Sequence, residues 1–394
     1  MRLMFLVGSY WPAQDGVSQV TQYLAEGLAK KHEVLVLAQR KPTMIEKEEH
    51  QEVNIERIYV ERSHYWRYMQ GEKKRARRRV KEYQPDVLIV VGIQNWGYDW
   101  FKKELDSYPG KKVLMTHGCS CLREYNVADK IKAVKIRRRI LADLLDVYHE
   151  WYGFRYKKSL EKDMAKFELV TYLFEEEKLH QYTKKLGLNN DMILENATED
   201  FFFDRKAYLV DDQKETVFIN VSNYEERKNQ RMILEAFYKA DLPNTRLDLI
   251  GFHENDYVHE LRNLQAKLQR ECKNNPQANI WTGLRREQVL NIYKNADVYV
   301  CASKWEAMSI SLCEAAAAGL TILSTKVGHV AQIPGVHLFS TEDELVKLMR
   351  DLYADSDLRR RSGKLANEFA ENNYRIQSKV DMLENALLKM CGKE

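Results

Sequence analysis

Two glutamates separated by seven residues, Glu306 and Glu314, are the side chains whose type and spacing most suggest binding chemistry. A carboxylate accepts hydrogen bonds from hydroxyl groups, which suits it to contact a sugar or a ribose. In one continuous helix the step between them would be about 80°, but with a loop between them both could face one ligand. The alternative is structural: Glu314 would close a Ser-x-x-Glu capping box with Ser311, and Glu306 would be a solvated loop charge.

Two short apolar runs, 296–301 and 320–324, flank the glutamates and predict buried strands. The segment between them, 303–319, predicts a loop and then a short helix rich in alanine. This helix would begin at the carboxyl end of a strand, where α/β sheets bind ligands and where free backbone N–H groups suit a phosphate. The residues expected at this helix start are Met308, Ser309 and Ile310.

The composition predicts a folded α/β protein with two domains. The chain has 394 residues, 44% of them hydrophobic, which is enough for two cores. Its six cysteines are scattered without zinc-ligand spacing, so we expect no metal site and no disulfide framework, and a reducing cytoplasm as the location. The start of the chain predicts a strand rather than a signal peptide, and no apolar run reaches the ~18 residues of a membrane span.

Positive charge is concentrated in one part of the chain. Residues 61–150 hold 20 lysines and arginines against 12 acidic residues, a net of +8 in a chain whose total is +4. The excess lies in two segments, 73–81 and 132–139, and favours contact with an anionic membrane surface or a phosphate-linked acceptor. Residues 65–81 predict a very basic helix. The alternative to a membrane contact is a helix packed on the core whose basic face is solvated.

The first domain opens with a strand at 2–7, a helix at 20–30 and a second strand at 33–37, a βαβ pattern that predicts a parallel sheet. In the first loop Gly16 could present its N–H to an anion or could be an ordinary turn glycine. Another predicted strand ends in His117, which could point into the crevice of the sheet or could be a structural histidine.

The second domain begins with a predicted strand at 216–221. The polar loop that follows contains Asn223, Arg227 and Lys228 and leads into a predicted helix at 231–238. A basic residue at such a junction is usually solvated. A functional role for Lys228 is therefore supported only by the whole set of motifs and not by this residue alone.

The frame Ala-Asp-Val-Tyr-Val…Ser-Lys-Trp-Glu…Cys-Glu-Ala-Ala-Ala-Ala-Gly resembles the signature of retaining nucleotide-sugar glycosyltransferases of the GT-B fold, glycosyltransferase family four. The resemblance implies an α/β fold of two Rossmann-like parallel-sheet domains that face a central cleft. It places the acceptor-side domain at 1–204 and the nucleotide-sugar domain at 215–373. A C-terminal helix, about 374–394, would cross back to the first domain.

The same resemblance implies roles for single residues. His117, Glu306 and Lys228 would be catalytic, with His117 and Glu306 at the donor sugar. Glu314 would hold the ribose. The donor diphosphate would contact residues of both domains, namely Gly16, Asn223, Arg227, Lys228, Met308, Ser309 and Ile310. The sequence departs from the family pattern at Asp15, Asn223 and Asn229, where the family has Gly, Arg and Gly.

The predicted function is therefore retaining, metal-independent transfer of a sugar from a nucleotide sugar, with a UDP-sugar expected, to a glycan, lipid-linked or cell-wall or capsule acceptor. No cofactor other than the donor and no nucleic-acid partner are expected. The predicted location is the cytoplasm, with peripheral attachment to the inner membrane leaflet. A non-catalytic GT-B subunit that binds a partner glycosyltransferase or a glycan is the alternative. A dinucleotide oxidoreductase would need a Gly-x-Gly-x-x-Gly after the first strand, which is absent.

Overall fold

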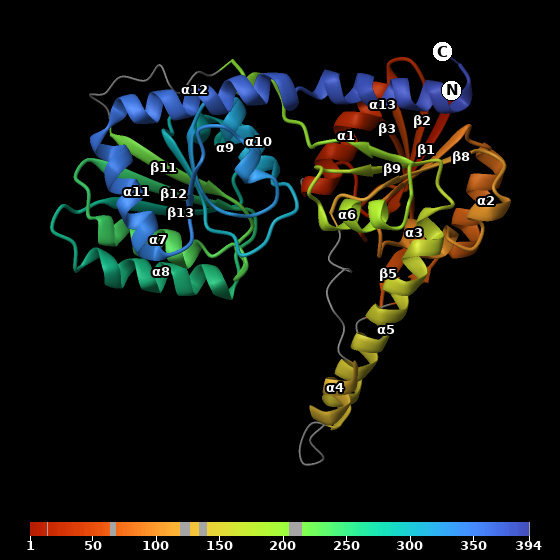
Figure 1. Cartoon of the computed structure of the whole chain (residues 1–394), viewed down its shortest axis with the longest axis horizontal. Coiled ribbons are helices and arrows are strands. Elements are labelled where there is room, and N and C mark those ends of the chain that lie inside the picture. The colour runs from red at the N-terminus through yellow and green to blue at the C-terminus, as the bar shows by residue number, and fades with distance from the viewer. Residues whose placement is uncertain (14, 64–67, 119–126, 134–139, 205–214, 394) are drawn as a thin grey trace. The chain divides into compact units, whose positions relative to one another are not determined.

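The computed structural model describes residues 1–13, 15–63, 68–118, 127–133, 140–204 and 215–393. The chain divides into an N-terminal unit, Met1–Glu195 with Lys379–Glu394, and a C-terminal unit, Asn196–Ser378. Each unit is an α/β domain built on one large sheet (Figure 1). No helix of the described residues is both long and apolar enough to cross a membrane.

The N-terminal unit contains an eight-stranded sheet in the order β10-β9-β8-β7-β1-β2-β4-β3. All neighbours pair in parallel except β3 and β4. The central strands are buried on both faces, as apolar runs of this kind require. The strands are β1 (Arg2–Val7), β2 (Glu33–Gln39), β3 (Lys47–His50), β4 (Val53–Ile58), β7 (Val87–Val91), β8 (Lys111–Met115), β9 (Leu169–Tyr172) and β10 (Asp191–Ile193), beside a small hairpin of β5 (Val60–Arg62) and β6 (Met69–Gly71).

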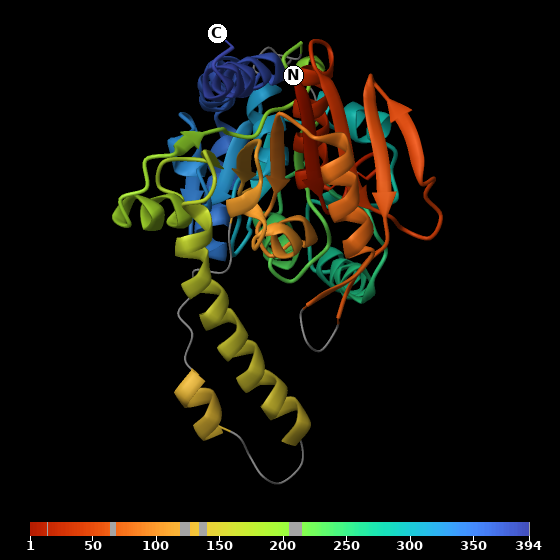
Figure 2. The same ribbon diagram turned by 90° about the vertical axis from the view of Figure 1, so that its right-hand side faces the viewer.

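Helices of the N-terminal unit cover the sheet, and one of them extends beyond it. Figures 1 and 2 show α5 running outward from the sheet with α4 beside its outer part. The helices are α1 (Gly16–Ala29), α2 (Lys73–Tyr83), α3 (Trp96–Phe101), α4 (Val127–Ala133), α5 (Ile140–Met164), α6 (Lys178–Lys185) and α13 (Ile376–Cys391).

The last helix, α13, returns the chain to the N-terminal unit. Lys379 pairs with Glu195 at 2.8 Å, and Lys31 pairs with Glu384 at 2.8 Å. Gly27 of α1 lies so close to α13 that an added Cβ would stand 2.3 Å from the Val380 side chain. These contacts fix α13 against α1.

The C-terminal unit contains a six-stranded, fully parallel sheet in the order β13-β12-β11-β14-β15-β16. Its strands are β11 (Thr216–Val221), β12 (Thr245–Gly251), β13 (Gln277–Thr282), β14 (Val298–Cys301), β15 (Thr321–Thr325) and β16 (His337–Phe339). Its helices are α7 (Gln230–Ala240), α8 (Asp256–Gln269), α9 (Arg286–Lys294), α10 (Ile310–Ala317), α11 (Glu342–Ala354) and α12 (Ser356–Asn373), with a short 3₁₀ turn, η3 (Asp200–Phe202).

Two local predictions are wrong. The basic segment 65–81 was expected to be helical throughout, but α2 begins at Lys73, because Met69–Gly71 pairs with β5. The capping box of Ser311 and Glu314 does not form, because Ser309 is the N-cap of α10 and Glu314 therefore lies in the second turn. Of the basic segment 132–139 only residues 132 and 133 are described, and most of the polar segment 204–214 also lies outside the described residues.

Candidate active site

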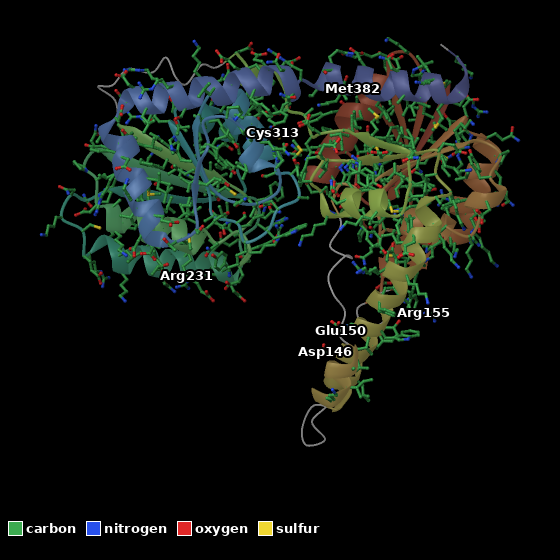
Figure 3. All side chains as sticks on the ribbon, viewed as in Figure 1. Asp146, Glu150, Arg155, Arg231, Cys313 and Met382 are labelled. Atoms are coloured by element: carbon green, nitrogen blue, oxygen red, sulfur yellow. The ribbon has the colours of Figure 1, made fainter. Side chains whose placement is uncertain are left out.

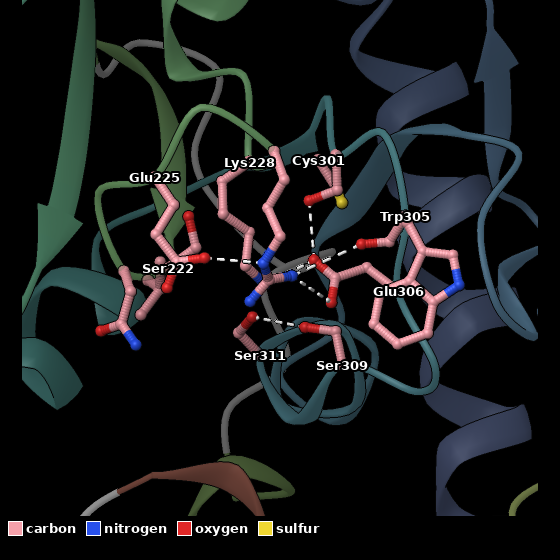
Figure 4. A network of polar contacts seen from close by, with 12 residues as sticks. Ser222, Glu225, Lys228, Cys301, Trp305, Glu306, Ser309 and Ser311 are labelled. Atoms are coloured by element: carbon pink, nitrogen blue, oxygen red, sulfur yellow. Dashed lines mark hydrogen bonds and ion pairs between the residues drawn. The ribbon is translucent and has the colours of Figure 1, made fainter. Parts of the chain in front are cut away.

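A buried ion pair in the C-terminal unit joins two of the predicted catalytic residues. Lys228 Nζ lies 2.5 Å from Glu306 Oε1, and each side chain is only about a tenth exposed. The Ser303 hydroxyl donates to the same carboxylate oxygen at 2.7 Å. Figure 4 shows the Lys228 and Glu306 side chains converging from two loops, one after β11 and one after β14. Both loops leave the carboxyl ends of neighbouring parallel strands, so the sheet brings the two residues together.

The loop after β11 explains one departure from the family pattern. Asn229 is the N-cap of α7 and has a φ of +55°, in the left-handed region that favours glycine. Asparagine tolerates this conformation better than most residues, so it can replace the family's glycine without changing the turn. Lys228 is therefore fixed immediately before a helix start.

Arg227 adds a second cation at the edge of this cluster. Its Nε donates to Glu225 at 2.6 Å, and its Nη1 lies 3.7 Å from Glu306 Oε2. The residue is exposed, in contrast to Lys228. The described contacts of Asn223 use its backbone carbonyl, which accepts a hydrogen bond from Gln230, and its exposed side chain is not among the groups that contact Glu306.

The start of α10 has the properties of an anion site. Ser309 is the N-cap but makes no side-chain hydrogen bond to the backbone, because its hydroxyl lies 2.9 Å from the Ser311 hydroxyl. The first N–H groups of a helix have no partner within the helix and carry partial positive charge. Met308 is bound inside the unit, since Asn196 donates to its carbonyl at 2.8 Å. Met308 thus fixes the loop. The N–H groups of residues 310–312 are the ones without a partner in α10, because the Cys313 N–H donates to the Ser309 carbonyl.

The loop after β15 packs closely against the loop that carries Glu306. Gly328, in the loop after β15, has a φ of +52°, and an added Cβ would stand 2.2 Å from the Ala307 carbonyl oxygen. The Thr325 hydroxyl donates to the Ser303 carbonyl at 2.7 Å. The position of Glu306 therefore depends on the last residue of β15, Thr325, and on the loop that follows it.

Glu314 lies apart from these contacts, in an ion pair that the sequence did not predict. Its side chain is 3% exposed, and its Oε1 accepts a hydrogen bond from Arg286 at 2.5 Å. Arg286 also binds Glu199 at 2.5 Å. The three residues are far apart in sequence, and no local pattern marks Arg286. The predicted ribose contact of Glu314 stays a prediction.

The N-terminal unit contains a cavity of about 500 Å³ at the carboxyl ends of β1, β7 and β8. His117 lines it and has a φ of +47°. The His117 Nε2 atom is buried and has no hydrogen-bond partner within the part of the chain that the structure describes. Burial lowers the pKa of His117 from 6.5 to about 4, with Asp15 opposing the shift, so the ring is neutral at pH 7.

The glycine predicted at the diphosphate is the first residue of α1, between two residues that line this cavity, Asp15 and Val17. Asp15 is the N-cap of α1: its Oδ1 accepts from the Ser18 N–H at 3.1 Å, and its Oδ2 accepts from the Ser9 hydroxyl at 2.5 Å. Asp15 has a negative φ, so this turn does not need the family's glycine. Other polar residues of the lining, Lys41, Asn95 and Thr116, come from separate segments and were not predicted.

Two family models match the chain, one in each half. Residues 201–369 match the family described as glycosyl transferases group 1, and residues 14–156 match glycosyltransferase family 4. The two matches together cover most of the chain. The chain belongs to the GT-B glycosyltransferases. The family, the fold and the enzyme class predicted from the sequence are thereby confirmed.

Solved structures of glycosyltransferases share the fold over the full length of this GT-B glycosyltransferase. Sucrose-phosphate synthase from Thermosynechococcus elongatus matches with a TM-score of 0.73 at 14% identity and 100% coverage of both chains. WaaG, a glycosyltransferase involved in lipopolysaccharide biosynthesis, matches with a TM-score of 0.66 at 19% identity and 98% coverage of both. HepE from Anabaena in complex with UDP-glucose matches with a TM-score of 0.68 at 13% identity, covering 99% of this chain and 100% of that one. The search of curated proteins finds no match.

Proposed function

We propose that this glycosyltransferase moves a sugar, with retention of anomeric configuration, from a UDP-sugar to a glycan or lipid-linked acceptor. The observation that carries the proposal is the buried Lys228–Glu306 pair, held by Ser303 beside the open start of α10. A departing nucleoside diphosphate carries about two negative charges, and preorganised cations and N–H groups stabilise such charge. Lys228 and the first turn of α10 would bind the diphosphate, and Glu306 would contact donor-sugar hydroxyls.

The choice of a UDP-sugar is supported by HepE, whose structure holds UDP-glucose on the same fold. The proposal gives the positive charge to Lys228, Arg227 and the helix start, so a divalent metal is not needed. We expect EDTA to leave the rate unchanged.

The proposal places the acceptor in the cavity of the N-terminal unit, where His117 keeps its predicted contact with the donor sugar. Its lining is mixed, with hydroxyl, amide and charged groups beside Tyr10 and Ile93, a composition suited to sugar rings. Its neutral His117 ring can accept or donate one hydrogen bond at Nε2, according to its tautomer.

The proposed attachment to an anionic membrane leaflet is supported by one exposed face of α5. Leu144, Trp151, Arg155 and Lys158 follow one another at steps of seven, four and three residues, so they lie on one helix face, and all are exposed. Aromatic and basic residues on one face are typical of helices that lie on membranes. Arg155, labelled in Figure 3, lies on the part of α5 that extends beyond the sheet.

The basic segment 73–81, most of which forms α2, gives the membrane proposal less support. Four arginines of α2 have carboxylate partners within the N-terminal unit: Arg75 with Glu46, Arg77 with Glu104, Arg78 with Glu82 and Arg79 with Glu56. Most of the charge of segment 73–81 is therefore neutralised inside the domain.

A panel of nucleotide sugars tests the main proposal. We expect the purified protein to hydrolyse one UDP-sugar slowly and to do so faster with an acceptor present, and Glu306→Gln to lose most of this rate. Donor binding without any hydrolysis would favour the non-catalytic subunit, and full activity of Glu306→Gln would show that its assigned role is wrong.

Vesicle sedimentation at low salt tests the membrane contact. Binding should need anionic lipid and should fall when Leu144 and Trp151 are changed to Ala. Met382→Ala, which removes an apolar side chain 39% exposed on α13, is the control (Figure 3). Binding that does not depend on anionic lipid would count against the membrane surface.

A further inference from the structure

One guanidinium in the C-terminal unit is shared by two carboxylates. Arg286 Nη2 donates to Glu199 and to Glu314, each at 2.5 Å, and Arg286 Nε donates to Glu199 at 3.2 Å. The guanidinium also lies over the ring of Phe202, 5.2 Å from its centroid. Hydrogen bonds between ionised groups are the strong ones, so this arrangement holds all three side chains in place.

The charges of this triad do not cancel. Two carboxylates and one guanidinium leave one negative charge, which is shared between the buried Glu314 and Glu199, whose side chain is 36% exposed. Glu314 is 3% exposed, but the Arg286 side chain that covers it is 23% exposed. A hydroxyl that approaches this edge therefore meets a guanidinium donor and a carboxylate acceptor together.

The triad also connects three separate segments around α10. Arg286 is the first residue of α9, Glu199 precedes η3, and Glu314 lies on α10. Further along α9, the Tyr293 hydroxyl donates to the Ser311 carbonyl at 3.2 Å, in the first turn of α10. The orientation of Glu314 and the position of the α10 start are thus set by the same helix.

We propose that Arg286 is a positioning residue for the nucleotide ribose. It holds the Glu314 carboxylate in one orientation, so that Glu314 accepts hydrogen bonds from the ribose hydroxyls, and Glu199 holds Arg286 in turn. The inference rests on the proposed use of a UDP-sugar. It differs from a purely structural role in one respect: the loss of Arg286 should weaken recognition of the ribose hydroxyls and leave recognition of the diphosphate intact.

The test is calorimetric titration of the full-length protein with UDP and with 2′,3′-dideoxy-UDP. Because hydrogen bonds to a charged group are at stake, we expect the wild type to bind UDP about 10- to 100-fold more tightly than the dideoxy analogue. Arg286→Met should abolish this preference and change the affinity for the dideoxy analogue by less than about threefold. Arg286→Lys keeps the positive charge but not the planar guanidinium that binds both carboxylates. It should therefore keep part of the preference for UDP that Arg286→Met loses.

Two further variants make the result specific. Arg285→Met alters the exposed neighbouring arginine and should keep the wild-type preference. Glu199→Gln weakens the support of Arg286 without removing the Arg286–Glu314 pair, so it should lose part of the preference even if Arg286→Met does not fold. Glu314→Gln combined with Arg286→Met should lose no more than either change alone, since both act on one interaction.

The outcomes that would overturn the inference are distinct from failure of the proposed function. A wild type that does not bind UDP would overturn the UDP-sugar proposal, and this inference with it. A wild type that prefers UDP, with an equal preference in Arg286→Met, would overturn the role of Arg286 alone. Equal weakening of UDP and of the dideoxy analogue in Arg286→Met would show that Arg286 only supports the fold.

Discussion

The predicted sites of the two units differ in how their polar groups are satisfied. In the C-terminal unit Lys228 and Ser303 both contact the Glu306 carboxylate, so the charges there are oriented before a ligand arrives. In the N-terminal unit the Nε2 of His117 is buried without a partner at the edge of a cavity. The site in the C-terminal unit is therefore suited to stabilising charge. The site in the N-terminal unit has hydrogen-bonding capacity that a bound ligand would satisfy.

Removal of the cation from the paired site should have the largest effect. We expect Lys228→Ala to lower the rate of donor cleavage about 10²- to 10³-fold, because one preorganised group that stabilises developing charge contributes that much. The measurement is the initial rate of UDP release. Lys347→Ala, an exposed lysine on α11, is the control. A full rate in Lys228→Ala would remove the distinction between the two sites.

Acid should destabilise both units through one buried histidine in each. Burial lowers the pKa of His117 and of His329 from 6.5 to about 4, and the His329 Nε2 lies 2.8 Å from the Tyr374 hydroxyl. The unfolded chain takes up these protons below pH 6.5 and the folded chain does not, so stability is lost as the pH falls from about 6.5 towards 4. The loss from His329 is about 3 kcal/mol at most.

Urea unfolding at pH 7 and at pH 4.5 measures this loss. His329→Gln should reduce the pH dependence, and a ligand that binds His117 should reduce the part that belongs to the N-terminal unit. The same pH dependence of the unfolding free energy in wild type and His329→Gln would show that His329 does not cause the loss of stability in acid.

A methyl group at Gly328 should disturb the Lys228–Glu306 pair, because Gly328 packs against the loop that carries Glu306. The added Cβ would overlap the Ala307 carbonyl, so we expect Gly328→Ala to cost about 1–3 kcal/mol of unfolding free energy and to displace the Glu306 loop. Gly187→Ala is the matched control: its φ is also positive, at +75°, but nothing lies within 4 Å of the added Cβ. Equal losses would show that backbone strain alone, without the overlap, is responsible.

The smallest expected effect concerns the carboxylate beside the unpaired histidine. Asp15→Ala should cost about 1 kcal/mol, because the N-cap of α1 is lost, whereas Asp15→Asn should keep most of the cap. Thermal unfolding checks this difference. If the Asp15 charge also affects the acceptor, the acceptor KM should change in Asp15→Asn while the stability does not.

The sequence predicted most of the fold, because buried parallel strands are continuous apolar runs and each is followed by a helical pattern. It also predicted the Glu306 loop, since strand, loop and helix lie within about 30 residues. It missed Arg286 and the cavity residues Lys41 and Asn95, because their neighbours in space are distant in sequence. The helix predicted at 65–81 failed where tertiary strand pairing overrides a local pattern.

The role of Asn229 could not be judged from the sequence either. The sequence shows only that asparagine replaces the family's glycine, whereas the backbone has a positive φ at this position that asparagine tolerates. At Asp15 the family's glycine is not required, because the turn has no positive φ, and the aspartate carboxylate instead caps a helix.

The most direct test of the account is hydrogen–deuterium exchange of the wild-type protein with and without UDP. The account predicts slower exchange at the amides of 310–312 and in the loop that holds Lys228 when UDP is bound, and no such protection in Lys228→Ala. Protection by UDP that leaves both of these segments unchanged would contradict the assignment of the donor site to the Lys228–Glu306 pair.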